Sequence, residues 1–175
     1  MAGIIKVNQI QDFNGNTLLT SDGNGNLTTQ DFNKPAFSAW LSGSDQSIAQ
    51  NTVTTLIADT EFFDTDNAYN TSTGKFTVPN NRQGMYFFNA GFTMSSNYDL
   101  VQAFIYINDS ARFRGTVVRN DASTMTVSAI INLNVGDEVT ARAYQSNATN
   151  SFQAGGDTSN PTRYMSYFSG FRIGS

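Results

Sequence analysis

The chain has 175 residues, of which 39% are hydrophobic and 14% are charged, and its formal net charge is −4. It has no block of basic residues and no apolar run near the ~20 residues of a membrane span, so we expect neither nucleic-acid binding nor membrane insertion. It contains no Cys and no His, which excludes disulfides, thiolate nucleophiles, zinc sites built on these residues, and Ser–His relays.

Residues 1–34 are predicted to form an extended N-terminal arm. They contain too little apolar mass to build a core of their own. The stretch FNGNTLLTSDGNGNLT is typical of two short strand–turn units. One interpretation is a disordered tail; the other, which the strand–turn pattern favours, is an arm that becomes ordered against sister subunits or a larger assembly. Its predicted anchoring residues are Ile4, Ile5, Val7, Ile10 and Phe13.

From residue 35 onward the sequence predicts strands. Short alternating apolar runs recur, each closed by Gly, Asn, Asp or Pro, and no sustained helical repeat is present. In chain order the runs are AFSAWL (36–41), TVTTLI (52–57), KFTVP (75–79), GMYFFNAGFTM (84–94), LVQAFIYIND (100–109), ARFRGTVV (111–118), TMTVSAIINL (124–133), DEVTARAYQ (137–145) and RYMSYFSGFRI (163–173). Their spacing predicts an antiparallel sandwich or jelly roll.

Several of these strands are apolar on both sides. Val101 and Ile105 fall on one side of their run, and Phe104 and Tyr106 fall on the other. Such strands are either central strands covered by a second sheet and a loop, or strands whose second side meets another subunit. The second interpretation is favoured, because a monomer seldom exposes a large apolar patch.

The turn residues also carry structural predictions. Pro79 can end a strand because it donates no ladder hydrogen bond, and Gly84 can adopt a turn conformation that is costly for other residues. Tyr86 and Phe88, two residues apart, are expected to fill the sandwich. The Gly136–Asp137 pair is interpreted as a hairpin turn between the runs on either side of it.

Residues 36–175 resemble the globular head of the complement C1q and tumour-necrosis-factor-like superfamily. The positions that carry the resemblance are Phe37; Tyr69; Gly74, Phe76 and Pro79; Gly84, Tyr86 and Phe88; Leu133, Gly136, Asp137 and Val139; and Phe168, Ser169, Gly170 and Phe171. The resemblance implies an all-β antiparallel jelly-roll sandwich of about ten strands, here residues 35–175, that forms a homotrimer and binds rather than catalyses.

Two sets of residues follow from this interpretation. The candidates for the trimer interface are Phe104, Tyr106, Phe168 and Phe171. The core motif comprises Phe76, Pro79, Gly84, Tyr86, Phe88, Gly136 and Asp137. Some relatives hold calcium near the threefold axis, but no acidic cluster here matches such a site, and Asp64–Asp66 is interpreted as a solvated turn. We therefore predict no metal site and no cofactor, and calcium has no clear motif to support it.

The segment before the head resembles the N-termini of virion proteins of tailed bacteriophages. Together the two resemblances predict a homotrimeric virion surface protein, assembled in the host cytoplasm and joined to capsid or tail proteins through its arm. It would decorate the capsid or project from it. The alternative is a tail-fibre or knob protein that binds a host-surface receptor or glycan through polar loops such as Gln145–Thr162, which are otherwise solvated loops.

Two further classes are disfavoured. An enzyme would need a carboxylate pair such as Asp64 with Asp66 or Asp137 with Glu138, but adjacent residues of a strand point to opposite sides and the first pair falls in a turn. We predict no catalytic residue. A secreted cytokine-like ligand would need a secretory signal, and the first residues lack its apolar segment.

Overall fold

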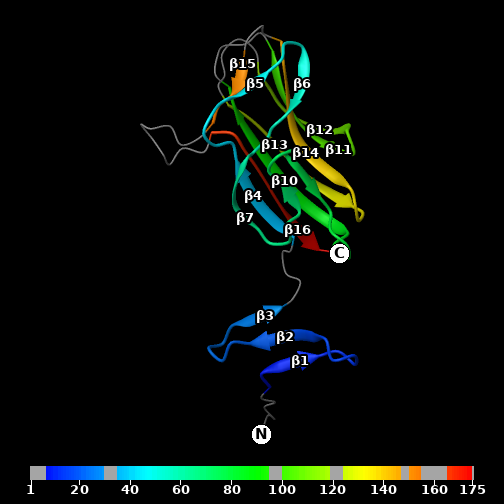
Figure 1. The fold of residues 1–175 in the computed structure, drawn as a ribbon. Helices are drawn as coiled ribbons and strands as arrows, with labels where there is room; N and C mark the ends of the chain where they lie inside the picture. Colours follow the sequence, from blue (N-terminus) through cyan, green and yellow to red (C-terminus); the bar gives the residue numbers. More distant parts are fainter. Residues whose placement is uncertain are drawn as a thin grey trace. The chain divides into compact units, whose positions relative to one another are not determined.

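A computed structural model of the chain describes residues 7–29, 35–94, 100–118, 124–146, 150–154 and 165–174 (Figure 1). All regular secondary structure in these ranges is β-strand. The chain divides into two compact units, Met1–Phe32 and Asn33–Ser175. The predicted anchoring residues Ile4 and Ile5 and most of the loop Gln145–Thr162 lie outside the described residues.

The first unit is a three-stranded antiparallel sheet. Its strands are β1 (Gln9–Gln11), β2 (Thr17–Ser21) and β3 (Leu27–Thr29), and they pair in that order. Ile10 pairs with Leu19 across β1 and β2, so their side chains share one side of the sheet. Val7, Ile10, Phe13 and Leu18 are about half exposed or more, and the unit therefore has almost no core.

The two turns of this sheet repeat one pattern, Asp-x-Asn-Gly-Asn, at Asp12–Asn16 and Asp22–Asn26. In the first turn one oxygen of Asp12 accepts the backbone N–H groups of Asn14 and Asn16, both at 2.9 Å, and the other accepts the Asn16 side-chain amide at 2.9 Å. The second turn has the same three bonds to Asp22. The sheet is thus held mainly by its turns.

The second unit has two main antiparallel sheets. Its strands are β4 (Ala36–Trp40), β5 (Gln46–Ile48), β6 (Thr52–Thr55), β7 (Thr60–Asp64), β8 (Tyr69–Asn70), β9 (Lys75–Thr77), β10 (Gly84–Thr93), β11 (Val101–Ile107), β12 (Ser110–Val118), β13 (Thr124–Leu133), β14 (Glu138–Gln145), β15 (Asn150–Phe152) and β16 (Tyr167–Gly174). The five-stranded sheet has the order β13-β10-β16-β4-β7, and the six-stranded sheet has the order β12-β11-β14-β9-β8, with β6 also paired to β14. The small β15-β5 pair lies at one end of the sandwich, and the end of β16 lies at the other (Figure 1).

The architecture confirms the predicted all-β antiparallel jelly roll. Every predicted run from 36 to 173 contains a strand. The prediction missed β5, β7, β8 and β15, which are short or lack clean apolar alternation. β5 and β15 pair with each other, and β7 pairs with β4, so these strands depend on partners distant in the sequence, which local sequence does not reveal.

Aromatic rings from both sheets fill the space between them. The ring of Phe37 lies 4.7 Å from that of Tyr69, 5.2 Å from that of Phe76 and 5.0 Å from that of Phe168, between centroids. Tyr86 and Phe88, from the core motif, are fully buried, as is Phe76. A Cβ on Gly170 would lie 2.4 Å from the Phe88 ring, so only glycine leaves room for these aromatics.

One turn has a different role from the predicted one. The Gly136–Asp137 turn was expected to close a hairpin, but β13 belongs to the five-stranded sheet and β14 to the six-stranded sheet. The turn therefore carries the chain from one sheet to the other. The N–H of Gly136 donates to the carbonyl of Val78 at 2.9 Å, which fixes the turn close to the end of β9. Pro79 follows that strand, and Gly84 begins β10.

Candidate functional site

The outer side of the five-stranded sheet carries an apolar row. Strand register places Ile130, Phe87, Phe171 and Ala36 side by side across β13, β10, β16 and β4. Ile130 is 61% exposed and Phe171 is 40% exposed, and the Phe87 and Phe171 rings lie 5.5 Å apart. Their backbone neighbours point the other way, into the core. The sequence therefore gives this sheet two apolar sides.

A bulge at the edge of the sheet adds two more aromatics. Ser38 pairs with Phe63 and Ala39 with Glu61, so Phe62 is an extra residue in β7. Phe62 and Phe63 are 52% and 51% exposed as a result. The Phe62 ring lies 4.1 Å from that of Trp40. Strand-pattern reasoning missed β7, and with it these two residues, although the adjacent aromatics in TEFFD were a visible signal.

We call this surface the apolar face. It comprises Ala36, Trp40, Phe62, Phe63, Met85, Phe87, Ile130, Phe171 and Ile173, on the outer side of the five-stranded sheet. A shallow groove on it is lined by Ala36, Ser38, Phe63, Phe87 and Phe171. The remaining exposed large hydrophobic residues of the second unit, Phe113, Val117 and Val135, lie elsewhere.

The apolar face carries no charged side chain in the part of the chain that the structure describes. The charged residues of its five strands are Glu61, Asp64 and Arg172. Their register partners on the neighbouring strands are Ala39, Phe37 and Tyr86, which point into the sandwich, so strand register places the charged residues on that side too. The polar groups that do point outward are neutral, as in the bond from the Asn89 amide to the Tyr167 hydroxyl at 3.2 Å. Absence of charge at the centre of a patch is typical of protein–protein interfaces.

The predicted interface candidates divide between several places. Phe171 lies on the apolar face. Phe168, three residues earlier, has 0% exposure; it stacks in the core and offers no surface to another copy, which corrects the prediction for this residue. The alternation of β16 separates the two, because Gly170 and Phe168 point inward while Phe171 points outward.

Phe104 and Tyr106 lie on the outer side of the other sheet. Their own chain already covers them: the guanidinium of Arg114 lies 5.7 Å from the Phe104 ring centroid, and that of Arg142 lies 4.3 Å from the Tyr106 ring centroid. Phe104 is only 8% exposed. Sequence alternation placed them correctly on a second side, where guanidinium groups of their own chain pack against their rings. Their part in a trimer interface stays a prediction.

Ion pairs surround this aromatic pair. Arg142 also pairs with Asp109, and Lys75 pairs with Glu138 at 2.6 Å. The hydrogen bond from Arg142 holds the pKa of the Asp109 carboxyl below its ordinary value, and the bond to Glu138 raises the pKa of Lys75. The outer side of the six-stranded sheet is therefore polar and charged, in contrast to the apolar face.

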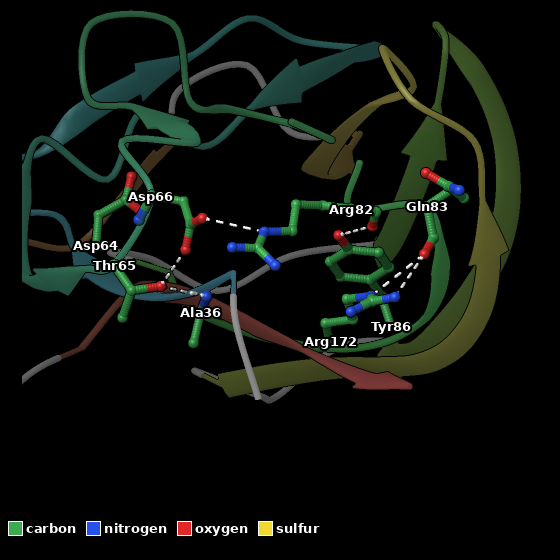
Figure 2. Close-up of polar contacts among 8 residues, drawn as sticks. All are labelled: Ala36, Asp64, Thr65, Asp66, Arg82, Gln83, Tyr86 and Arg172. Atoms are coloured by element: carbon green, nitrogen blue, oxygen red, sulfur yellow. Dashed lines mark hydrogen bonds and ion pairs between the residues drawn. The ribbon is translucent and has the colours of Figure 1, made fainter. Parts of the chain in front are cut away.

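A polar corner fixes one end of the apolar face (Figure 2). The side chain of Arg82 pairs with that of Asp66 at 3.4 Å, and the backbone carbonyl of Arg82 accepts a hydrogen bond from the Tyr86 hydroxyl. The hydroxyl of Thr65 donates to Asp66 at 2.8 Å and accepts the N–H of Ala36 at 3.0 Å. These bonds tie the corner before β10 to the start of β4, so the rows of the sheet keep their register at this end.

The same corner engages both carboxylates of the Asp64–Asp66 turn in bonds within the chain. The oxygens of Asp64 accept the N–H groups of Asp66 at 3.2 Å and Tyr69 at 2.7 Å. Within the described ranges no three Asp or Glu side chains gather as a metal site. Burial raises the pKa of Tyr86 to about 12, so its phenol stays protonated at neutral pH.

The second carboxylate pair, Asp137 and Glu138, also forms bonds within the chain. Asp137 accepts the N–H of Asn134 and the side-chain amide of Asn108, both at 2.8 Å, while Glu138 binds Lys75. No helix in the described ranges is long and apolar enough to cross a membrane.

Comparison with known proteins identifies the second unit. The C1q domain family model matches residues 36–173. No curated protein sequence matches the chain. Among solved structures, the globular domain of zebrafish complement 1qA aligns with a TM-score of 0.53 at 20% identity over 81% of this chain and 98% of that one. Murine APRIL aligns with a TM-score of 0.58 at 12% identity over 79% and 98%.

A further similar structure is a viral component. The PRD1 vertex protein P5 aligns with a TM-score of 0.58 at 15% identity, covering 79% of this chain and 96% of that one. At these identities the structural similarities establish the fold alone.

Proposed function

Because the chain belongs to the C1q domain family, we propose that it is a homotrimeric structural protein of a phage particle, anchored by its N-terminal arm and exposed on the capsid. Domains of this family are generally binding or structural modules rather than enzymes, and the resemblance to the family implies a homotrimer. The single observation that carries the proposal is the uncharged apolar face, which a lone copy would leave in water.

The size and composition of that face support self-association. A soluble monomer seldom exposes a large contiguous apolar patch, and this face extends across all five strands of its sheet. Packing three copies through it would place Phe87 and Phe171 near the common axis. In this arrangement the charged outer side of the six-stranded sheet, with Lys75 and Arg142, would point to solvent.

The placement on a particle has two supports. One is the structural similarity to the PRD1 vertex protein. The other is the first unit, a small sheet with exposed Phe13 and Leu18 that has little to bury by itself. We propose that these side chains dock on a capsid protein. A tail-fibre or knob protein with a glycan-binding loop is the alternative assignment.

The trimer is tested by changing Phe171. The Phe171→Asp variant places three carboxylates at the proposed axis, so we expect a folded monomer of 19.1 kDa where the wild-type protein has three times that mass. Val117→Asp is the matched control, because Val117 is similarly exposed but belongs to β12, in the other sheet. Sedimentation equilibrium measures both. A Phe171→Asp protein that remains trimeric would show that the face is not the interface.

The location is tested on particles that carry the protein. Gold-labelled antibodies against the second unit are expected to mark the shell in electron micrographs. Labelling confined to the tail would favour the fibre or knob assignment, and particles without label would contradict the virion proposal. Removing residues 1–30 is expected to leave a trimeric second unit that no longer joins particles. A truncated protein that still joins them would exclude the arm as the anchor.

A further inference from the structure

The N-terminal sheet has two sides of different character. Ile10 and Leu19 are register partners and point to one side, and a shallow groove is lined by both of them together with Val7, Asn8 and Gln9. Gln9 and Thr20 are the adjacent pair, so their side chains point to the other side. A sheet with an apolar side is stabilised when that side is buried against another element.

Charge does not oppose contact between copies on the Ile10 side. The acidic residues of the described part of this unit are Asp12 and Asp22, and both lie in the turns, where each carboxylate is occupied by backbone and side-chain N–H groups. The strands themselves carry only Gln, Thr, Ser, Ile and Leu. A copy of the same sheet would therefore meet no like charge there.

The position of Ala36 indicates which molecule could cover the Ile10 and Leu19 side of the N-terminal sheet. The chain enters the second unit at β4, and Ala36 lies in the apolar row that the proposed trimer would bury. Three copies of Ala36 would then start from one shared surface. Only residues 30–35 separate it from β3, a stretch that spans roughly 20 Å at most. Tethers this short hold linked groups at effective concentrations of about a millimolar.

We propose that the three N-terminal sheets of one trimer pack against one another through the Ile10 and Leu19 side, forming a second, smaller threefold core. This inference rests on the proposed trimer. The molecule that covers the Ile10 and Leu19 side is a sister copy and not a particle protein. Phe13, in the turn after β1, then remains available to the particle, so self-association and anchoring use different residues of the same unit.

Because the chain contains no cysteine, a single introduced cysteine provides a specific site for cross-linking. Leu19 and Thr20 are adjacent in β2 and pair with Ile10 and Gln9, so they point to opposite sides of the sheet. In the full chain, Leu19→Cys is expected to form cross-linked dimers with a short bis-maleimide reagent, and Thr20→Cys about tenfold less. Equal cross-linking of the two, or more by Thr20→Cys, would overturn the inference.

A second measurement avoids altering the arm. Hydrogen exchange of the wild-type trimer is expected to show protected amides in β1–β3, and the Phe171→Asp protein, with an unchanged arm, is expected to lose that protection. Protection that survives in the monomer would show that the sheet needs no sister copy, and unprotected amides in a wild-type trimer would also refute the packing. A wild-type monomer would instead refute the trimer of the proposed function.

Discussion

Phe88 and Phe171 show how one residue type serves two purposes in the same sheet. Phe88 has no exposed surface and touches Phe37, Phe76 and Phe168, so it supports the sandwich of a single copy. Phe171 is 40% exposed and contacts Phe87 on the outer side. Strand alternation separates the roles, which means that substitutions at the two positions should affect different measurements.

Phe88→Ala is expected to lower the free energy of unfolding by about 3–5 kcal/mol, because it removes a fully buried ring and leaves a cavity. Phe113→Ala is the matched control: Phe113 is 36% exposed, so its truncation should cost much less. Urea melts of both variants in the Phe171→Asp background keep dissociation out of the measurement. A Phe88→Ala midpoint equal to that of the control would contradict the burial of Phe88.

At the scale of elements, the repeated turns of the N-terminal sheet replace a core. Each carboxylate closes its loop by accepting N–H groups, and Gly15 and Gly25 have φ of 83° and 93°, values that glycine tolerates best. The side-chain amides of Asn16 and Asn26 are the main reason that the pKa values of Asp12 and Asp22 fall below the ordinary 3.8. The charged forms therefore hold the turns.

These shifts predict how the sheet responds to acid. A lowered pKa in the folded sheet means that the stabilisation is fully present above pH 3.8 and is lost as the pH falls through the lower folded value. Asn16→Ala should raise the pKa of Asp12 toward 3.8 and leave Asp22 unchanged as an internal control. Carboxyl chemical shifts followed by NMR against pH measure both. An unmoved Asp12 midpoint would contradict the role of Asn16.

The sequence predicted strands better than it predicted sheets. Alternation in TMTVSAIINL and DEVTARAYQ located β13 and β14, but it could not say that the turn between them joins two sheets, because partner choice depends on distant strands such as β10 and β9. The irregular TEFFD was missed because its bulge breaks the alternation that marks a strand.

The candidate site was predictable only in part for a similar reason. Phe171 follows from the pattern. Phe104 and Tyr106 were placed on the correct side of their strand, yet nothing local to them indicates that Arg114 and Arg142 cover their rings. The contribution of Phe62 and Phe63 depends on a register that only the paired strand β4 defines. Which apolar side is covered by the chain itself is a tertiary property.

At the scale of the whole molecule, the two outer sides of the sandwich differ in electrostatic character. The apolar face is neutral, while the opposite side carries ion pairs such as Lys75 with Glu138. Salt screens exposed charges but strengthens, or leaves unchanged, contacts that depend on apolar burial. The oligomer and the surface ion pairs should therefore respond differently to ionic strength.

We expect the trimer to persist from low to high concentrations of sodium chloride, because no charged pair crosses the proposed interface. Light scattering after size exclusion gives the mass at each concentration, and urea at constant salt is a positive control for dissociation. A mass that falls steadily as salt rises would mean that ion pairs hold the copies together, and the neutral apolar face would then not be the main contact.

The position of β16 in the five-stranded sheet also affects biosynthesis. This strand comes last in chain order among the described strands, yet it lies between β10 and β4. Until it leaves the ribosome, β4 and β7 can pair with each other but have no link to β10, and Phe171 is absent from the surface. A nascent chain interrupted earlier would lack part of the proposed interface, so we expect oligomer formation to select against truncated translation products.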